Sequence, residues 1–134
     1  MTPEQSTPLL DAMIEGVCLV DPKTLRIVTA NQMLTALVGI AQADFVGMPI
    51  VELTQSPEDL FFWEDVAAGL TDHILSDTRL RCIDGVAIPV ERKVSRVWLD
   101  PGNPVFLVGV RDLRQQRQAE EQLEDRMAEL RATL

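Results

Sequence analysis

The C-terminal stretch from residue 105 to residue 134 constrains the fold most, because an apolar run passes without a break into a helical pattern. Residues 105–111 are mostly apolar and rich in valine, which predicts a strand buried on both faces. Residues 112–134 contain no Gly or Pro and consist mainly of strong helix formers, which predicts a helix. Movement in the sheet could therefore pass directly into this helix and reach whatever follows residue 134.

Apolar side chains recur on the predicted helix at intervals of four, three and four residues, the spacing of a coiled-coil seam. Extended backward, the seam meets two polar residues before it reaches an apolar one near the start of the helix. The predicted dimer seam comprises Leu113, Leu123, Met127, Leu130 and Leu134. So narrow an apolar stripe favours a partner helix, and we expect a homodimer in which a second copy supplies it. The alternative is a helix that folds back on its own domain.

Length and charge limit the classes of function that the chain can serve. Its 134 residues suit one domain with an extension, and its net charge of −9 argues against nucleic acid or an anionic membrane as the main partner. No apolar run approaches the roughly 18 residues of a membrane span, and the N-terminus lacks the pattern of a signal peptide. We expect a cytoplasmic location without direct membrane insertion, although a longer parent protein could carry membrane spans.

The order of the predicted elements indicates the α+β class. Two positions are expected to cap helices with their side chains, namely Asn31 and Ser56. Helices are predicted over residues 8–16, 31–39, 41–46, 49–53 and 57–70, and strands over 17–20, 25–30, 74–83, 86–99 and 105–111. Two strands, several short helices and then three strands are typical of an antiparallel sheet with helices on one face. The buried character of the last strand predicts that it lies centrally in this sheet.

Several pieces of the chain, taken in order, resemble a PAS domain over roughly residues 8 to 112. They are Glu15-Gly-Val17 leading into Leu19-Val-Asp21, Arg26-Ile-Val-Thr-Ala-Asn31, Gly39 followed by Phe45-Val-Gly47, Asp84-Gly-Val-Ala-Ile-Pro-Val-Glu91 and the junction Val110-Arg-Asp-Leu-Arg114. The resemblance implies a five-stranded antiparallel sheet with short helices on one face, followed by a signalling helix of coiled-coil type. It divides the chain into an N-terminal capping helix (1–16), a PAS core (17–111) and a linker helix (112–134).

The resemblance also implies a sensory and dimerisation module rather than an enzyme. Such modules commonly precede a histidine kinase of a two-component system, a diguanylate cyclase or a transcriptional regulator in bacteria, so an output domain is expected beyond residue 134. The junction departs from the family pattern, because Leu113 and Arg114 replace the usual Ile and Thr after Asp112. Arg111, Asp112 and Arg114 are the expected coupling residues at the point where the strand becomes the helix.

Cofactor signatures of the family fit this chain poorly. Flavin photosensors carry a reactive cysteine just after the asparagine that corresponds to Asn31, whereas Gln32 follows here. Heme-binding members use a histidine within the long helix, whereas His73 falls past its end. Flavin and heme are therefore disfavoured, and the identity of any small-molecule ligand is unknown.

A ligand cavity, if open, would lie between the helices and the sheet. Its candidate lining residues are Met33, Leu37, Leu53, Phe61, Val66, Leu70, Leu80 and Leu107. The same side chains would fill the space in the alternative function, a ligand-free dimerisation scaffold with a packed core. Four strand arginines, Arg79, Arg81, Arg92 and Arg96, could meet an anion if they point inward but are more typical of a solvated sheet face.

Other candidate reactive residues have simpler interpretations. Cys18 and Cys82 lie in apolar, strand-like settings and are expected to be small buried hydrophobic residues rather than a disulfide or metal site. His73, with Asp72 and Asp77, is more typical of a solvated helix end than of a metal or acid/base site. No Gly-rich phosphate loop, metal motif or Ser-His-Asp arrangement is apparent in the sequence.

Overall fold

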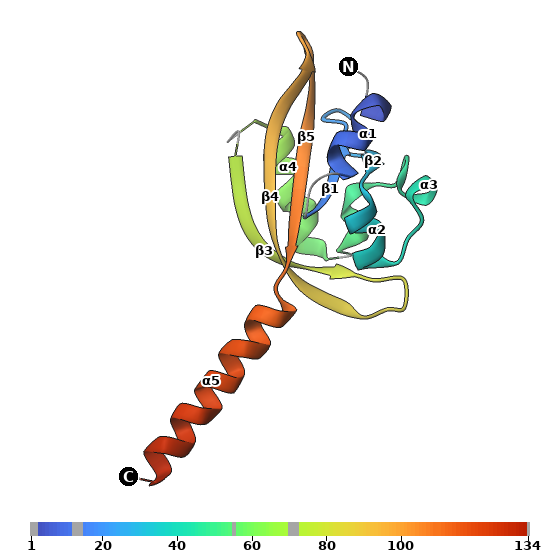
Figure 1. The fold of residues 1–134 in the computed structure, drawn as a ribbon. Coiled ribbons are helices and arrows are strands. Elements are labelled where there is room, and N and C mark those ends of the chain that lie inside the picture. The colour runs from blue at the N-terminus through green and yellow to red at the C-terminus, as the bar shows by residue number, and fades with distance from the viewer. Residues whose placement is uncertain (1–2, 12–14, 55, 70–72, 134) are drawn as a thin grey trace.

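Five antiparallel strands form one sheet in the order β2-β1-β5-β4-β3 (Figure 1). The computed structural model describes residues 3–11, 15–54, 56–69 and 73–133. The strands are β1 (Gly16–Val20), β2 (Ile27–Ala30), β3 (His73–Arg81), β4 (Ala87–Asp100) and β5 (Asn103–Asp112). The predicted α+β class and five-stranded antiparallel sheet are confirmed.

The last strand occupies the centre of the sheet, as its apolar sequence predicts. β5 pairs with β1 on one side and with β4 on the other. Because side chains alternate between the faces of a strand, Phe106, Val108 and Val110 point into the main core beneath the helices. Val105 and Leu107 point to the opposite face, where they join a smaller apolar cluster. Both faces of β5 are thus covered, which explains why its sequence lacks the alternation of a half-exposed strand.

Four short helices follow the second strand and precede the third strand in the chain, and they cover the main core. They are α2 (Gln32–Val38), α3 (Gln42–Phe45), the 3-10 helix η1 (Ile50–Leu53) and α4 (Pro57–Ala67). Asn31 caps α2 as predicted, since its Oδ1 accepts from the Leu34 amide at 3.0 Å, and Gly39 ends the helix with φ of 86°. Ser56 stands at the predicted N-cap of α4, but its hydroxyl bonds the Glu58 carboxylate and makes no side-chain cap to the backbone.

The N-terminal helix lies five residues earlier than predicted. α1 spans Pro3–Asp11, so Pro8 is inside the helix and not at its start, and Gly16 is the first residue of β1. Gly16 is needed for a close approach, because a Cβ there would lie 2.9 Å from Cγ2 of Val110 on β5. Leu10 of α1 is 4% exposed and packs in the smaller cluster on the second face of the sheet. The prediction of a helix near the N-terminus is confirmed, but its predicted end at residue 16 is wrong, because Gly16 begins β1.

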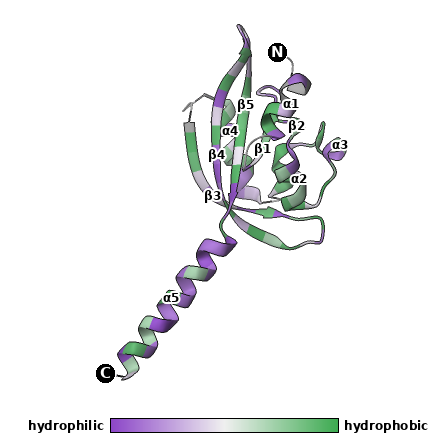
Figure 2. Ribbon diagram, viewed as in Figure 1, coloured by the Kyte–Doolittle hydropathy of each residue, from purple (hydrophilic) through white to green (hydrophobic). Residues whose placement is uncertain are grey.

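The C-terminal helix α5 (Arg114–Thr133) projects away from the sheet in continuation of β5 (Figure 1). None of its described residues is buried, and its surface is predominantly hydrophilic with scattered apolar positions (Figure 2). The predicted helix is present and does not fold back on its own domain. No helix among the described residues is both long enough and apolar enough to cross a membrane.

Candidate functional site

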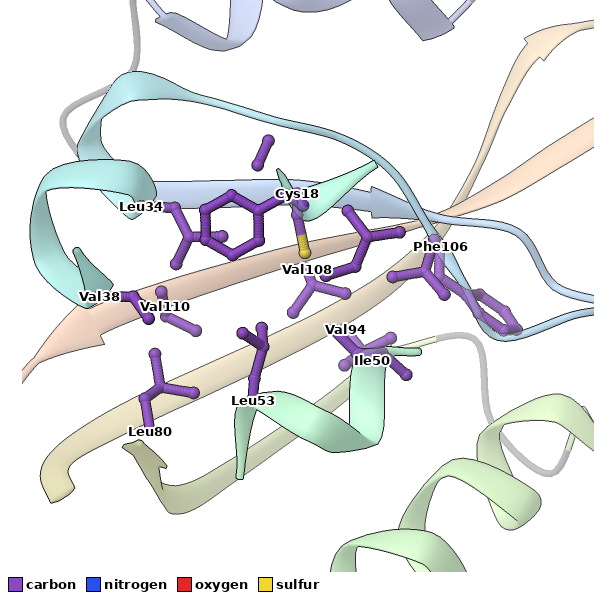
Figure 3. Close-up of a cluster of buried hydrophobic side chains, with 14 of the residues drawn as sticks. Cys18, Leu34, Val38, Ile50, Leu53, Leu80, Val94, Phe106, Val108 and Val110 are labelled. Carbon is purple, nitrogen blue, oxygen red and sulfur yellow. The ribbon is translucent and has the colours of Figure 1, made fainter. Parts of the chain in front are cut away.

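Buried hydrophobic side chains gather in the space between the helices and the sheet (Figure 3). A hollow of about 10 Å³ lies within this main core, lined by Cys18, Leu34, Ile50, Leu53, Thr54, Trp63, Leu80, Arg92, Val108 and Val110. That volume is about what one water molecule needs, whereas small-molecule pockets commonly measure about 300–1,000 Å³. In this conformation the core is packed and leaves no room for an organic ligand.

Four of the predicted lining residues belong to this core. Leu53 and Leu80 line the hollow itself, and Val66 is buried in the same apolar cluster. Leu37 is partly buried and packs against that cluster from α2. The structure therefore brings these four side chains into one region, as the helical and strand periodicities predicted.

Three other predicted lining residues lie elsewhere. Leu107 points to the opposite face of the sheet, one residue out of phase with Phe106 and Val108. Met33 and Phe61 are 46% and 66% exposed and do not reach the main core. Met33 instead lines a separate hollow of about 190 Å³ beside α2, together with Leu37 and Val110. In α4 the aromatic side chain that enters the core is the fully buried Trp63, two positions and about 200° of helical rotation beyond Phe61. Leu70 falls outside the described residues.

A buried ion pair between α4 and β4 is the feature that sequence reasoning missed. Arg92 Nη1 lies 2.6 Å from Asp59 Oδ1, and both side chains are almost fully buried, at 6% and 4% exposure. The second carboxylate oxygen of Asp59 accepts from the Thr54 hydroxyl at 2.8 Å and from the Trp63 indole at 3.1 Å. The Arg92 guanidinium lies 3.8 Å from the centroid of the Phe62 ring. This network fastens α4 to the sheet.

Burial and pairing act in opposite directions on the Arg92 guanidinium. Removal from water lowers the pKa of Arg92, while the adjacent Asp59 carboxylate raises it. The two opposite charges compensate each other in the core. The Asp59 carboxylate accepts further hydrogen bonds and the Arg92 guanidinium donates one to Ser76, which offsets the cost of burying the pair. The sequence gives only a weak signal for this ion pair. Asp59 lies in the first turn of a helix, where acidic residues are common, and Arg92 is one of four strand arginines, of which the other three are exposed or half-buried.

A second buried polar residue, Asn31, joins three segments of the chain. Its Oδ1 accepts from the Val17 amide at 2.9 Å in addition to the cap bond with Leu34. Its Nδ2 donates to the carbonyls of Leu10 and Glu15, both at 2.9 Å. All four hydrogen-bonding positions of this amide are used, and the residue is fully buried. Asn31 thereby ties α1 and the start of β1 to α2, a role that its sequence position as a helix cap does not reveal.

The predicted coupling residues form a charged junction between β5 and α5. The Arg114 guanidinium bonds both oxygens of Asp112, at 2.8–3.2 Å, and the Arg114 amide donates to Oδ1 at 2.9 Å. These bonds lower the pKa of Asp112. Their contribution to the stability of the fold is therefore fully present above the ordinary pKa of that carboxyl, and it is lost as pH falls through the lowered pKa. Arg111 pairs instead with Glu91 across the sheet, at 3.1 Å.

The predicted dimer seam divides into a buried and an exposed part. Leu113 is 6% exposed, and its amide donates to the Pro89 carbonyl at 3.0 Å, so it anchors the junction within the domain. Leu123, Met127 and Leu130 are 60%, 48% and 66% exposed on α5. Leu134 lies outside the described residues. The exposed apolar stripe of α5 therefore consists of three described residues.

The two cysteines occupy different environments and form no disulfide with each other. Cys18 on β1 is buried, and burial raises the pKa of its thiol to about 12. Cys82 follows β3 and is partly buried; desolvation and the nearby Asp84 carboxylate raise its pKa as well. Both thiols stay protonated near neutral pH, which disfavours thiolate chemistry. Among the described residues no cluster of three or more acidic, Cys or His side chains could hold a metal ion.

Comparison with known proteins agrees with the fold. No curated protein sequence matches the chain. The PAS domain of a two-component sensor histidine kinase has 16% identity and a TM-score of 0.67, covering 81% of this chain and 94% of that one. The PAS domain of an HTR-like protein from Haloarcula marismortui has 20% identity and a TM-score of 0.67, covering 81% and 95%. A LOV protein from Rhodobacter sphaeroides has 18% identity and a TM-score of 0.71, covering 90% and 71%.

The family is established by sequence as well as by shape. The family model of the PAS domain matches residues 14–115, which is most of the chain and corresponds closely to the sheet and its helices. The structural likenesses, all below 25% identity, support the same fold. PAS domains are typical sensory modules of signal transduction, and the resemblance noted in the sequence is confirmed: the chain belongs to the PAS domain family.

Proposed function

We propose that the chain is a cytoplasmic, non-enzymatic sensory and dimerisation module that passes conformational change through α5 to an output domain. The parent protein would be a bacterial histidine kinase, diguanylate cyclase or transcriptional regulator. Two copies pair through the exposed stripe of α5, continued by Leu134, and the signal is a shift between two packings of this helix pair. Binding of a small molecule or a protein partner at the PAS core biases that shift.

The observation that carries this proposal is the direct connection between the central strand and an unburied helix. β5 pairs with β1 over residues 106–110 and with β4 over most of its length, and it leads through Asp112 and Leu113 into α5. The Asp112–Arg114 ion pair holds the first turn of the helix against the end of the strand. Because this pair is partly exposed, it adds little stability, and its value lies in fixing the direction of α5.

The packed core favours a second candidate function, a ligand-free dimerisation scaffold. The hollow in the main core measures about 10 Å³, about the room that one water molecule needs. A ligand would have to open the core by displacing α4 or by breaking the Asp59–Arg92 pair. In the scaffold, the signal would come from a protein partner that contacts the outside of the domain.

Native mass spectrometry of the purified protein, compared with its denatured mass, distinguishes these functions. We expect a dimer. Additional mass that denaturation releases would establish a bound ligand and support the sensor of small molecules. A dimer without additional mass would support the scaffold, and a monomer at micromolar concentration would contradict the role given to α5.

The α5 seam makes its own prediction. Met127→Glu places a charge in the middle of the apolar stripe, and we expect it to raise the dimer dissociation constant by roughly tenfold or more. Gln118→Glu adds the same charge on the opposite side of the exposed helix and should leave dimerisation unchanged. Sedimentation equilibrium of both variants measures the effect. Equal dissociation constants for the two variants would show that this seam does not hold the dimer.

A further inference from the structure

The edge strand β3 carries backbone groups that no other strand among the described residues uses. β3 pairs with β4 alone, in a register without shifts from His73 to Arg81. The Cys82 amide donates to the Val86 carbonyl at 2.8 Å, so alternation along the ladder directs the backbone groups of even-numbered residues toward β4. The amides and carbonyls of the odd-numbered residues therefore face the open edge. In β3 these residues are His73, Leu75, Asp77, Arg79 and Arg81.

Open space adjoins the second half of this edge. A hollow of about 440 Å³ is lined by Thr54, Ser56, Thr78, Arg79, Arg81 and Ala87. Its walls come from β3, from β4 and from the segment before α4. Within the part of the chain that the structure describes, no strand or helix occupies this space, so another strand has room to enter beside Thr78.

The charges on β3 are poorly matched within the chain itself. Asp77 stands directly opposite Glu91 on β4, a like charge whose carboxylate already binds Arg111 at 3.1 Å. Arg79 stands opposite Pro89, which offers no charge. Both side chains are exposed and share the outer face of β3, two residues apart. Neither forms an ion pair with a described residue, so a cation beside Asp77 and an anion beside Arg79 would both lower the free energy.

We propose that β3 pairs antiparallel with β3 of a second copy, around a two-fold axis at Thr78. Each Asp77 then lies opposite Arg79 of the second copy, and each Leu75 lies opposite Arg81. All these residues direct their backbone groups to the edge, so the pairing can add about eight hydrogen bonds. If one strand moved along the other by two residues, Asp77 would lie opposite Asp77 for one direction of the shift, and Arg79 opposite Arg79 for the other. The charges therefore select one register of a self-complementary contact.

This contact is separate from the proposed seam on α5. Thr78, Val90 and Asp112 lie in one row across the sheet. In a sheet continued through two β3 strands, the two β5 strands lie five strand spacings apart, about 24 Å. The axis is perpendicular to the sheet, so the two α5 helices start far apart and point in opposite directions. The edge contact would link one α5 pair to another, and it stands or fails independently of the proposed function.

Disulfide cross-linking tests the two-fold axis. Thr78 faces itself across the axis as a non-hydrogen-bonded pair, whose Cα atoms lie about 4.5 Å apart, within the range of a disulfide. In the 134-residue chain carrying Cys82→Ser, the variant Thr78→Cys should form a covalent dimer under mild oxidation, while the buried Cys18 remains unreactive. Lys23→Cys, in an exposed turn, measures random collision. A yield from Thr78→Cys no greater than from Lys23→Cys would overturn the proposal.

Charge reversal in the same background tests the register. Asp77→Arg or Arg79→Asp alone places like charges opposite each other and should lower the cross-linking yield roughly tenfold. The double variant restores both ion pairs with their signs exchanged, keeps the net charge of −9 and should recover most of the yield. Circular dichroism confirms that each variant is folded. If single and double variants cross-link equally, Asp77 and Arg79 serve only to shield the edge from aggregation, and the proposed register is wrong.

Discussion

Asp59→Ala is expected to lower the free energy of unfolding by about 3–5 kcal/mol, because it leaves the buried Arg92 guanidinium without its counter-ion. The change also removes the acceptor for the Thr54 hydroxyl and the Trp63 indole. A typical domain is stable by only about 5–15 kcal/mol, so the loss is a large part of the total. Urea denaturation followed by circular dichroism measures it. Glu64→Ala, at an exposed position of the same helix, should change the value by less than about 0.5 kcal/mol.

A double-mutant cycle measures how strongly Asp59 and Arg92 depend on each other for the stability of the fold. Asp59→Leu with Arg92→Met removes both charges and keeps apolar volume at the site. We expect this double variant to be more stable than either single variant, since no unpaired charge remains buried. Costs that simply add would show that the two residues act independently, in conflict with the 2.6 Å contact.

Asn31→Ala is expected to cost about 3 kcal/mol or more. It leaves the amides of Val17 and Leu34 and the carbonyls of Leu10 and Glu15 without their partner in a buried site. Asn31→Ser keeps an acceptor at the helix cap but cannot reach the other groups, so it should recover only about 1 kcal/mol. Denaturation curves give both values, with the exposed neighbour Gln32→Ala as the control.

Hydrogen exchange locates the damage caused by Asn31→Ala. Because the Asn31 amide bonds the Leu10 carbonyl, its loss should release α1 from the second face of the sheet. Amides of α1 and of β1 are expected to exchange faster, while those of β3 and β4 keep their protection. Uniform acceleration across the sheet would indicate global destabilisation without a special role for Asn31 in holding α1.

The cap function of Asn31 and the burial of β5 were predictable from the sequence, because both depend on residues that lie close by in the chain. A polar side chain before a helical apolar pattern can reach the first free amides whatever surrounds it. The apolar run over residues 105–110 needs cover on both faces, so the central position of β5 follows from its composition. The exposed stripe at Leu123, Met127 and Leu130 was likewise visible as a heptad spacing.

The phase of side chains within each element was less predictable. Leu107 and Phe106 are equally apolar, and only the pairing of β5 with β1 and β4 decides which of them faces the helices. Among the three successive aromatic residues of α4, the sequence-based prediction placed Phe61 in the wall of the cavity. The rotation of the helix buries Trp63 instead, because its indole reaches Asp59.

The sequence by itself determined the order of elements, the family and the strand-to-helix joint, since these depend on local periodicity and on motifs in a fixed order. Tertiary structure alone decided the charged pair in the core, where Asp59 and Arg92 lie 33 positions apart, and the unused edge of β3. The physical reason is that a charge is costly in the core unless a partner meets it there. Contacts between residues so far apart in the chain depend on how helices and strands pack, and this packing cannot be predicted from a short stretch of sequence.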